Sequence, residues 1–355
     1  LVLGDGTTLA NAITADSVNP GAALRFIMTG DNTNNTVTTV TGPITFNADA
    51  TTGGHFVGPT TSGRINVNGP VNLAGIATAL SVRLGNLRFA GGGTYPEIQV
   101  RANTTSLGAN NGIATTAVMD LAGNGSPTVP TYFDLNGFNQ TLAGLKNIVG
   151  PANLGVVTNS SATASTLTLD LGAGGPFTFS GNLAGKLSLI LNSGSQTLTG
   201  TNAYSGNTTV NGGTLALANA TLAANSTVTV ASGAVLQLDF PVTNQVFGLV
   251  LNGINQPAGV YNSTTSSPFL AGPGSLLVAP VATNPTNITA VVVGNQYQLS
   301  WPASHTGWSL QAQTNSLSTG LSGNWVTVPG SASVNQISVP INPANGSVFF
   351  RLIYP

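Results

Sequence analysis

The side chains that could do chemistry are few and widely spaced. The 355 residues include only 8 Lys and Arg, 9 Asp and Glu and 2 His, and they include no Cys. Enzymes that cleave polysaccharides use clustered carboxylates, often with a bound cation and a basic group. The acids to test for such a cluster stand singly along the chain, at Asp5, Asp16, Asp31, Asp49, Glu97, Asp120, Asp134 and Asp170.

Two pairings of these acids are open if the chain forms stacked rungs. Asp31 could meet Asp49 on a neighbouring rung, and Asp120 could meet Asp134. No two acids are adjacent or separated by one residue, so the sequence lacks a paired-acid motif of the kind that two-carboxylate hydrolysis needs. We therefore predict that the protein has no catalytic residues, and we keep polysaccharide cleavage only as a third hypothesis.

The histidines and one Asx-rich segment are the candidates for a metal site. His55 and His305 lie in stretches flanked by Gly or Ser, with no suitably spaced His, Asp or Glu, so we expect exposed loop histidines. Residues 31–35 (DNTNN) resemble a calcium loop but lack the Gly and the terminal Glu of an EF-hand. Such clusters usually form Asx turns. We predict no metal and no cofactor.

Four arginines fall within one stretch of the chain, at Arg64, Arg83, Arg88 and Arg101. Two interpretations are open. These guanidinium groups bind an acidic glycan or a negative patch on a neighbouring copy, or their stems cover apolar surface while the charged ends stay in water.

The three tryptophans, Trp301, Trp308 and Trp325, all lie near the C-terminus. Aromatic faces suit sugar rings, so a stacking platform is one interpretation. Trp301 and Trp308 lie in strand-like runs, and one buried Trp is usual in the core of a β-sandwich. We therefore predict that Trp301 is a core residue.

Charge depletion limits the classes of partner. Charged residues make up 5% of the chain, against about 25% in an ordinary soluble domain. Between Lys186 and Arg351 the only charged residue is Asp239. The net charge of −1 argues against nucleic acid and against an anionic membrane surface, both of which require clustered Lys and Arg. No apolar run reaches the roughly 18–20 residues of a membrane-spanning helix, so we expect no membrane insertion.

The elements that must position these residues are strands and sharp turns. Apolar and polar residues alternate at 166–171, 186–191 and 227–230, with the period of two that strands require. Turn pairs such as Asn136-Gly137 and Asn252-Gly253 stand between such runs, and Asn and Gly tolerate positive φ. Units of this kind recur about every ten to twelve residues. Two or more of these units per coil predict the rungs of a β-solenoid.

The segment 199–278 resembles a known family. Residues 199–215 (TGTNAYSGNTTVNGGTL) are similar to the autotransporter-associated β-strand repeat, and residues 232–236 (SGAVL) resemble its companion strand. Residues 249–261 (LVLNGINQPAGVY) and 272–278 (GPGSLLV) resemble the closing rungs of such proteins. The resemblance implies a right-handed parallel β-helix of the passenger type. No membrane barrel follows in this sequence, so the secretion route of autotransporters is not implied.

The composition changes after residue 278. Residues 279–285 (APVATNP) read as a linker, and strand-like runs then follow at 296–301, 308–313, 324–328, 336–339 and 348–353. Residues 298–301 (QLSW), 307–311 (GWSLQ) and 349–352 (FFRL) resemble a fibronectin-III-like module. Short C-terminal domains of this kind follow autotransporter-associated repeats in surface proteins of Verrucomicrobia-like bacteria, and the resemblance implies such an origin.

Together these observations predict an all-β protein: a right-handed parallel β-helix (β-solenoid) at 1–278, a linker at 279–285 and a small β-sandwich at 286–355. We expect an extracellular or cell-surface structural protein that assembles with itself into a filament or sheath. The alternative is a monomeric adhesin that binds glycans, such as extracellular polysaccharide, or surfaces. Because Leu1 begins a strand-like run, we also expect that a leader or a longer segment precedes it in the natural protein.

Overall fold

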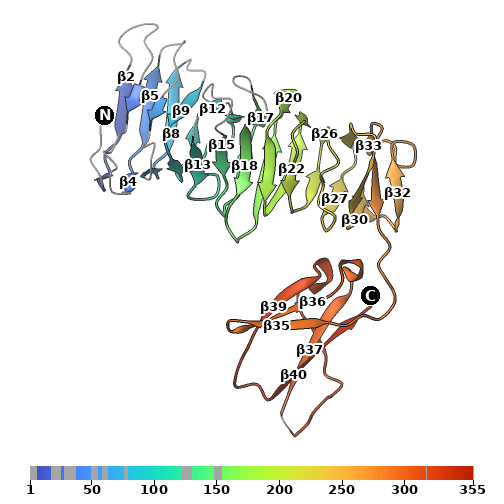
Figure 1. Cartoon of the computed structure of the whole chain (residues 1–355). Coiled ribbons are helices and arrows are strands. Elements are labelled where there is room, and N and C mark those ends of the chain that lie inside the picture. Colours follow the sequence, from blue (N-terminus) through green and yellow to red (C-terminus); the bar gives the residue numbers. More distant parts are fainter. Residues whose placement is uncertain are drawn as a thin grey trace.

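The computed structural model describes residues 6–16, 25–27, 37–48, 55–57, 63–75, 79–101, 103–121, 130–147, 154–316 and 318–354, and every structural statement below refers to these. It consists of a solenoid of stacked parallel strands and a smaller antiparallel domain joined to its C-terminal end (Figure 1). Within these residues the only helical turns are η1 (Ala303–His305) and η2 (Ser331–Ser333). No helix there is long and apolar enough to cross a membrane.

One face of the solenoid is a nine-stranded parallel sheet, here called sheet A. Each of its strands belongs to a successive coil, so neighbours in the sheet lie far apart in sequence. The strands are β1 (Thr8–Leu9), β4 (Val37–Val40), β7 (Arg64–Val67), β10 (Leu87–Phe89), β13 (Thr104–Leu107), β15 (Thr131–Asp134), β18 (Gly155–Asn159), β21 (Asn182–Gly185) and β24 (Ala203–Tyr204).

The N-terminal coils have two further faces. The four-stranded sheet B contains β2 (Ile13–Asp16), β5 (Ile44–Ala48), β8 (Val71–Gly75) and β11 (Gly93–Thr94). The six-stranded sheet C contains β3 (Arg25–Ile27), β6 (His55–Val57), β9 (Leu80–Leu84), β12 (Glu97–Val100), β14 (Val118–Leu121) and β17 (Gly144–Lys146). The chain visits sheets A, B and C in turn, which gives each complete coil three sides.

The later coils continue on two other sheets. Sheet D contains β16 (Gln140–Leu142), β19 (Ser165–Asp170), β22 (Leu187–Ser193), β25 (Thr208–Val210), β27 (Thr227–Val230), β30 (Gly248–Leu251) and β31 (Ile254–Asn255). Sheet E contains β20 (Phe177–Phe179), β23 (Ser195–Leu198), β26 (Gly213–Leu217), β28 (Ala234–Leu238) and β33 (Leu270–Ala271). At the C-terminal end two pairs of strands are antiparallel: β30 with β31, and β32 (Gly259–Asn262) with β34 (Ser275–Val278). Strand β34 also pairs with β29 (Thr243–Val246), in parallel.

Alternating apolar residues build one continuous core inside the coils. Along β19 every second residue, from Ser165 to Leu169, is buried, as the period-two pattern of the sequence predicts. Phe56 packs edge-to-face against Phe46 on one side and Phe89 on the other, with ring centroids 5.8 and 5.7 Å apart. Such aromatic pairs stabilise a core beyond the area they bury.

Glycines allow the corners of successive coils to stack closely. A Cβ atom added to Gly69 would lie 2.0 Å from the carbonyl oxygen of Gly42, and one added to Gly91 would lie 2.2 Å from the backbone of Gly69. Backbone atoms at this distance leave no space for any side chain. The glycine column therefore fixes the approach of three coils.

Three buried amide side chains form hydrogen bonds with backbone groups that no adjacent strand pairs with. Gln196 accepts a hydrogen bond from the backbone nitrogen of Leu145 and donates one to its carbonyl oxygen, each at 3.0 Å. Gln140 contacts both backbone groups of Ile113 in the same way, at 3.2 and 3.0 Å. Asn244 does so with Leu222, at 2.9 Å for both bonds. Each amide thus satisfies a buried peptide group on a side where no strand pairs with it.

The C-terminal domain is a sandwich of two three-stranded antiparallel sheets. One contains β35 (Thr289–Val293), β36 (Gln296–Ser300) and β39 (Gln336–Pro340), and the other contains β37 (Ser309–Asn315), β38 (Val326–Thr327) and β40 (Ser347–Ile353). Its buried core is small, comprising Leu299, Trp301 and Leu310 with partly buried neighbours. These observations confirm the predicted fold class: a parallel β-solenoid followed by a small antiparallel β domain.

Candidate functional site

The four arginines at 64, 83, 88 and 101 lie on two faces of the solenoid. Arg64 and Arg88 lie on sheet A, in β7 and β10. Arg83 lies in β9, and Arg101 directly follows β12, so both belong to the sheet C side. The stretch of four arginines is therefore two pairs on different sheets, and the single patch that the sequence allowed does not form.

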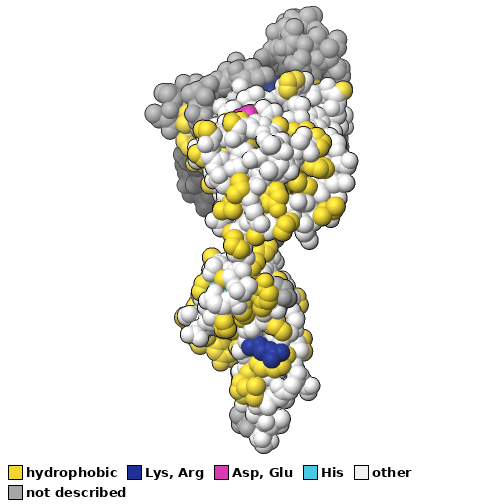
Figure 2. All heavy atoms as spheres, turned by 90° about the vertical axis from the view of Figure 1, so that its right-hand side faces the viewer, with side chains coloured by type: hydrophobic (Ala, Val, Ile, Leu, Met, Phe, Trp, Pro, Cys, Tyr) yellow, Lys and Arg dark blue, Asp and Glu magenta, His cyan; other side chains and the backbone are white. Residues whose placement is uncertain are grey.

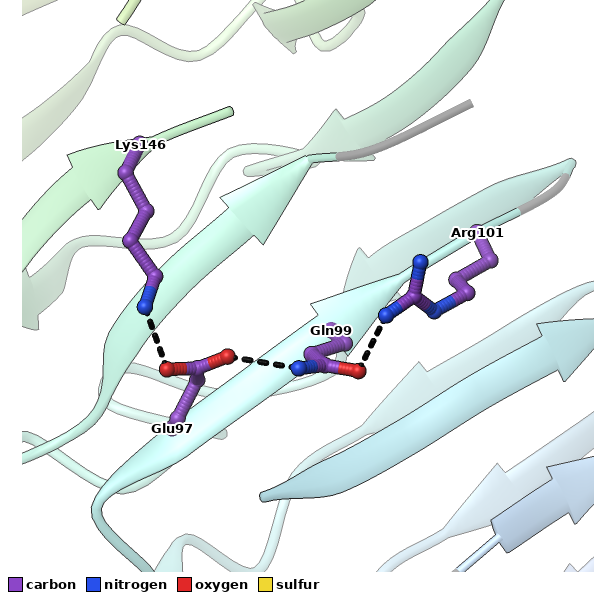
Figure 3. A network of polar contacts seen from close by, with 4 residues as sticks. All are labelled: Glu97, Gln99, Arg101 and Lys146. Carbon is purple, nitrogen blue, oxygen red and sulfur yellow. Dashed lines mark hydrogen bonds and ion pairs between the residues drawn. The ribbon is translucent and has the colours of Figure 1, made fainter. Parts of the chain in front are cut away.

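A polar network on sheet C contains the one ion pair among the described residues. Lys146 of β17 pairs with Glu97 of β12, and Gln99 donates from Nε2 to Glu97 Oε1 at 2.7 Å. Arg101 donates from a terminal nitrogen to Gln99 Oε1 at 2.5 Å. Figure 3 shows the four side chains in a line along the strands, each pointing toward the next.

The network leaves little reactive surface. The side chains of Lys146 and Glu97 are 12% and 17% exposed, and both oxygens of Glu97 have partners. Asp120 lies on β14, the strand between the two, and it is fully buried. The arrangement joins β12 to β17 across the intervening strand, which is a structural task, and it offers no exposed carboxylate to a substrate.

The two acids expected to meet on neighbouring rungs are separated. Asp120 lies on sheet C, whereas Asp134 ends β15 on sheet A. Asp134 is occupied by its own surroundings: Oδ1 accepts hydrogen bonds from the backbone nitrogens of Asn136 and Ser160, and Oδ2 accepts one from Ser160 Oγ at 2.6 Å. The pairing that the sequence left open does not form, because the chain passes from one face of the solenoid to another between the two residues.

The other candidates for a metal site give no cluster. Among the described residues, no group of three or more His, Asp or Glu side chains could hold an ion. Asp5, Asp49 and the segment 31–35, for which an Asx turn is predicted, lie outside those residues, as does the possible pairing of Asp31 with Asp49. Asp170 accepts a hydrogen bond from Ser193 Oγ at a corner of the solenoid.

The histidines differ from the expected exposed loop residues. His55 is the first residue of β6. His305 lies in η1 and is 3% exposed. Its Nε2 contacts the carbonyl oxygen of Asn284 at 2.7 Å, and its Nδ1 contacts Ser304 Oγ at 3.1 Å. The ring also packs on Trp308, so the histidine ties the linker to the sandwich.

The tryptophans do not form an exposed stacking platform. Trp301 and Trp308 are 4% and 6% exposed, which confirms the core assignment of Trp301. The indole nitrogen of Trp308 donates to the carbonyl oxygen of Ala282 in the linker, at 2.7 Å. The half-buried Trp325 lies under the guanidinium group of Arg351, 4.3 Å from its ring centroid.

A cleft of about 260 Å³ lies between the end of the solenoid and the sandwich. Its lining, which includes Phe247, Val281 and Asn335, contains no Asp, Glu, Lys or Arg among the described residues. The cleft therefore has apolar and hydrogen-bonding groups but nothing that titrates near neutral pH.

Sheet A carries a polar pocket of about 280 Å³, lined by Gly63, Arg64, Asn86, Thr104, Ser106, Asp134 and Asn136. Arg88 is not part of this lining but stands at its border, next to Ser106 on the neighbouring strand. We call the lining together with Arg88 the two-arginine pocket. Arg64, Arg88 and Asp134 were candidates from the sequence, but the amide and hydroxyl side chains of the lining were not. These polar residues alternate with buried residues along successive strands, but this pattern points to a pocket only when the register of the strands is known.

Arg64 and Arg88 are each held by one hydrogen bond from Nε, and their terminal nitrogens are available to a ligand. Arg64 Nε donates to Asn66 Oδ1 at 3.0 Å, and Arg88 Nε donates to the carbonyl oxygen of Leu107 at 3.2 Å. Within the described part of the chain, neither guanidinium group forms an ion pair or a hydrogen bond through its terminal nitrogens. The pKa of Arg64 lies below its usual value, mainly because burial disfavours the charged form of the guanidinium group. The positive charge of the nearby Arg88 lowers this pKa further.

The chain was also compared with known proteins. It matches no protein-family model, no curated protein and no solved structure. Its function is therefore inferred from its own fold and surface.

Proposed function

We propose that the protein is an extracellular structural protein whose copies associate into a filament or sheath through solenoid and sandwich contacts. The observation that carries this proposal is strand β35. All five of its residues are exposed, and Val291, Val292 and Val293 are 51%, 60% and 56% exposed. Three adjacent exposed valines in one strand are unusual on a surface that faces only water.

The position of β35 makes it available for pairing. It stands at the edge of its sheet, where β36 is its single partner among the described strands. The other side of its backbone is therefore open to a further strand. Natural edge strands are usually protected by charged residues, prolines or bulges. β35 contains no charged residue and no proline, so we infer that another chain adds to the sheet at this edge.

Low charge permits close packing of identical copies. The net charge of the chain is −1, and Arg351 is the only charged residue after Asp239. Figure 2 shows a single basic side chain on the face of the sandwich in that view, surrounded by hydrophobic and uncharged atoms. Copies of the sandwich therefore repel one another only weakly.

The solenoid suits the role of a rigid spacer. Its parallel strands bind each coil to the next along sheet A, and its core continues through the whole stack. The proposal gives the protein no catalytic role, since Glu97 is paired and Asp134 is occupied by hydrogen-bond donors. An extracellular location follows from the resemblance to surface-exposed β-helical repeats and stands as part of the proposal.

A charged substitution in β35 tests the proposal. We expect Val292→Lys to abolish concentration-dependent association measured by light scattering, because a lysine at an open edge opposes strand addition. The matched control is Val242→Lys, at a valine that is 54% exposed and outside any strand. It adds the same charge and is expected to leave association unchanged.

Folding of the variants can be followed separately in the two domains. All three tryptophans lie in the sandwich, so their fluorescence reports on that domain alone. The proposal fails if the wild-type chain stays monomeric at every concentration, a result that would favour the monomeric adhesin. It also fails if Val292→Lys, with its fluorescence unchanged, associates as the wild type does.

A further inference from the structure

We propose that the two-arginine pocket on sheet A binds an acidic polysaccharide, with a carboxylate or sulfate group of one sugar unit held between Arg64 and Arg88. This inference is independent of self-association, since the pocket lies on the solenoid and β35 lies in the sandwich. A filament that binds acidic glycan along its length would attach to an extracellular matrix.

The register of sheet A brings the two cations to one place. Asn66 on β7 lies directly opposite Arg88 on β10, and Arg64 is two residues before Asn66 on the same face of β7. Arg64 and Arg88 are therefore diagonal neighbours on adjacent strands. Their charges are close enough for Arg88 to lower the pKa of Arg64. Two like charges this close are costly, and a bound anion between them would remove that cost.

The arginines are positioned in advance of any ligand. Each Nε is engaged by an oxygen of the protein, which fixes the plane of the guanidinium group and leaves its terminal N–H groups for a ligand. Gly108 leaves space for Arg88: an added Cβ there would lie 3.0 Å from Arg88 Nε. Planar guanidinium groups with free N–H pairs bind carboxylate and sulfate oxygens in a bidentate manner.

The remaining lining favours a sugar over other anions. Asn86, Asn136, Thr104 and Ser106 supply amides and hydroxyls, which can bond to sugar hydroxyl groups. A volume of about 280 Å³ falls just below the range of roughly 300–1,000 Å³ typical of pockets for larger ligands. It therefore suits one unit of a longer polymer.

Calorimetric titration of the full-length chain tests the inference. The probes are oligogalacturonate as the carboxylate source, dextran sulfate as the sulfate source, neutral dextran and a DNA duplex. We expect Arg64→Gln and Arg88→Gln each to weaken binding about tenfold, as the loss of a charge-assisted hydrogen bond implies. The double variant should show no binding. Arg88→Lys, which keeps the charge but loses the planar group, should give an intermediate loss.

The control is Arg83→Gln, which removes the same charge from an exposed position on sheet C. It should bind as the wild type does. Binding of oligogalacturonate alone, of dextran sulfate alone, or of both supports the pocket and identifies the anionic group. The inference is overturned if neither anionic glycan binds, if neutral dextran or DNA binds as tightly, or if Arg83→Gln loses as much affinity as Arg64→Gln. Circular dichroism of each variant verifies that the solenoid is intact.

Discussion

The strands of the solenoid and those of the sandwich differ in how many of their edges are paired. In the solenoid, strands within the stack have a neighbour on each side in sheet A, and one core runs through the coils. In the sandwich, three residues form the buried core, and β35 is exposed along its whole length. A domain of this size rarely gains more than about 3–5 kcal/mol from its core. Strands inside the solenoid stack are thus paired on both sides, whereas the sandwich retains an open edge at β35 for another chain.

The largest expected difference between the two regions concerns corner glycines. Gly69→Ala places a Cβ 2.0 Å from the carbonyl oxygen of Gly42, a backbone clash that no side-chain movement relieves. We expect a loss on the order of 4 kcal/mol or more, seen as loss of the far-ultraviolet circular dichroism of the solenoid.

The matched control lies in the sandwich. Gly323 has no atom within 4 Å of an added Cβ, so Gly323→Ala should leave both domains unchanged. In Gly69→Ala the tryptophan fluorescence of the sandwich should persist, since that domain has its own core. Simultaneous loss of both signals would contradict the view that the two regions fold as separate units.

The second largest effect on stability is expected at a buried amide side chain of the solenoid. Gln196→Met keeps the length of the side chain but leaves the backbone nitrogen and carbonyl of Leu145 without their partner. We expect destabilisation of the solenoid by about 2–4 kcal/mol, the cost of two unsatisfied buried groups. Urea unfolding followed by circular dichroism measures it. Gln237→Met is the control, because the Gln237 amide bonds only to the exposed Asp239. Equal effects in the two variants would show that the amide contacts are not structural.

A smaller, pH-dependent effect comes from a buried tyrosine of the solenoid. Burial raises the pKa of Tyr204 to about 12, and its hydroxyl is 2.6 Å from Thr208 Oγ1. The unfolded chain has the ordinary value near 10. The stabilisation from the raised pKa is therefore complete below pH 10 and is lost as the pH rises from about 10 to 12. Its size is on the order of 2 kcal/mol.

Alkaline unfolding of Tyr204→Phe checks this linkage. The variant should lose less stability between pH 10 and 12 than the wild type does. Some alkaline loss should remain, because burial also raises the pKa of Tyr95, whose hydroxyl accepts a hydrogen bond from the backbone of Ala114. An unchanged pH profile in Tyr204→Phe would mean that Tyr204 ionises freely in the folded chain.

Local patterns were sufficient to predict many strands of the solenoid. The run at 227–230 coincides with β27, and the turns at Asn136-Gly137 and Asn252-Gly253 have the positive φ that those residues favour. Strand β35 was missed. Its residues are exposed on both faces, so its five residues show no alternation, and period-two reading cannot detect it.

The candidate pocket was beyond local patterns because it depends on coil length. The strands of sheet A begin at Leu87, Thr104 and Thr131, so successive coils differ greatly in length. A fixed repeat cannot show that Arg88 stands beside Ser106 and that Asp134 follows on the next strand. Residue types suggested the chemistry, but only the register placed the residues together.

Electron microscopy of the full-length protein over a range of concentrations tests the central claim most directly. The proposal predicts that the wild-type chain forms extended assemblies as its concentration rises, and that Val292→Lys appears as single particles, each a rod with a small domain at one end. Single particles of the wild type at high concentration would contradict the claim that the sandwich edge recruits another chain.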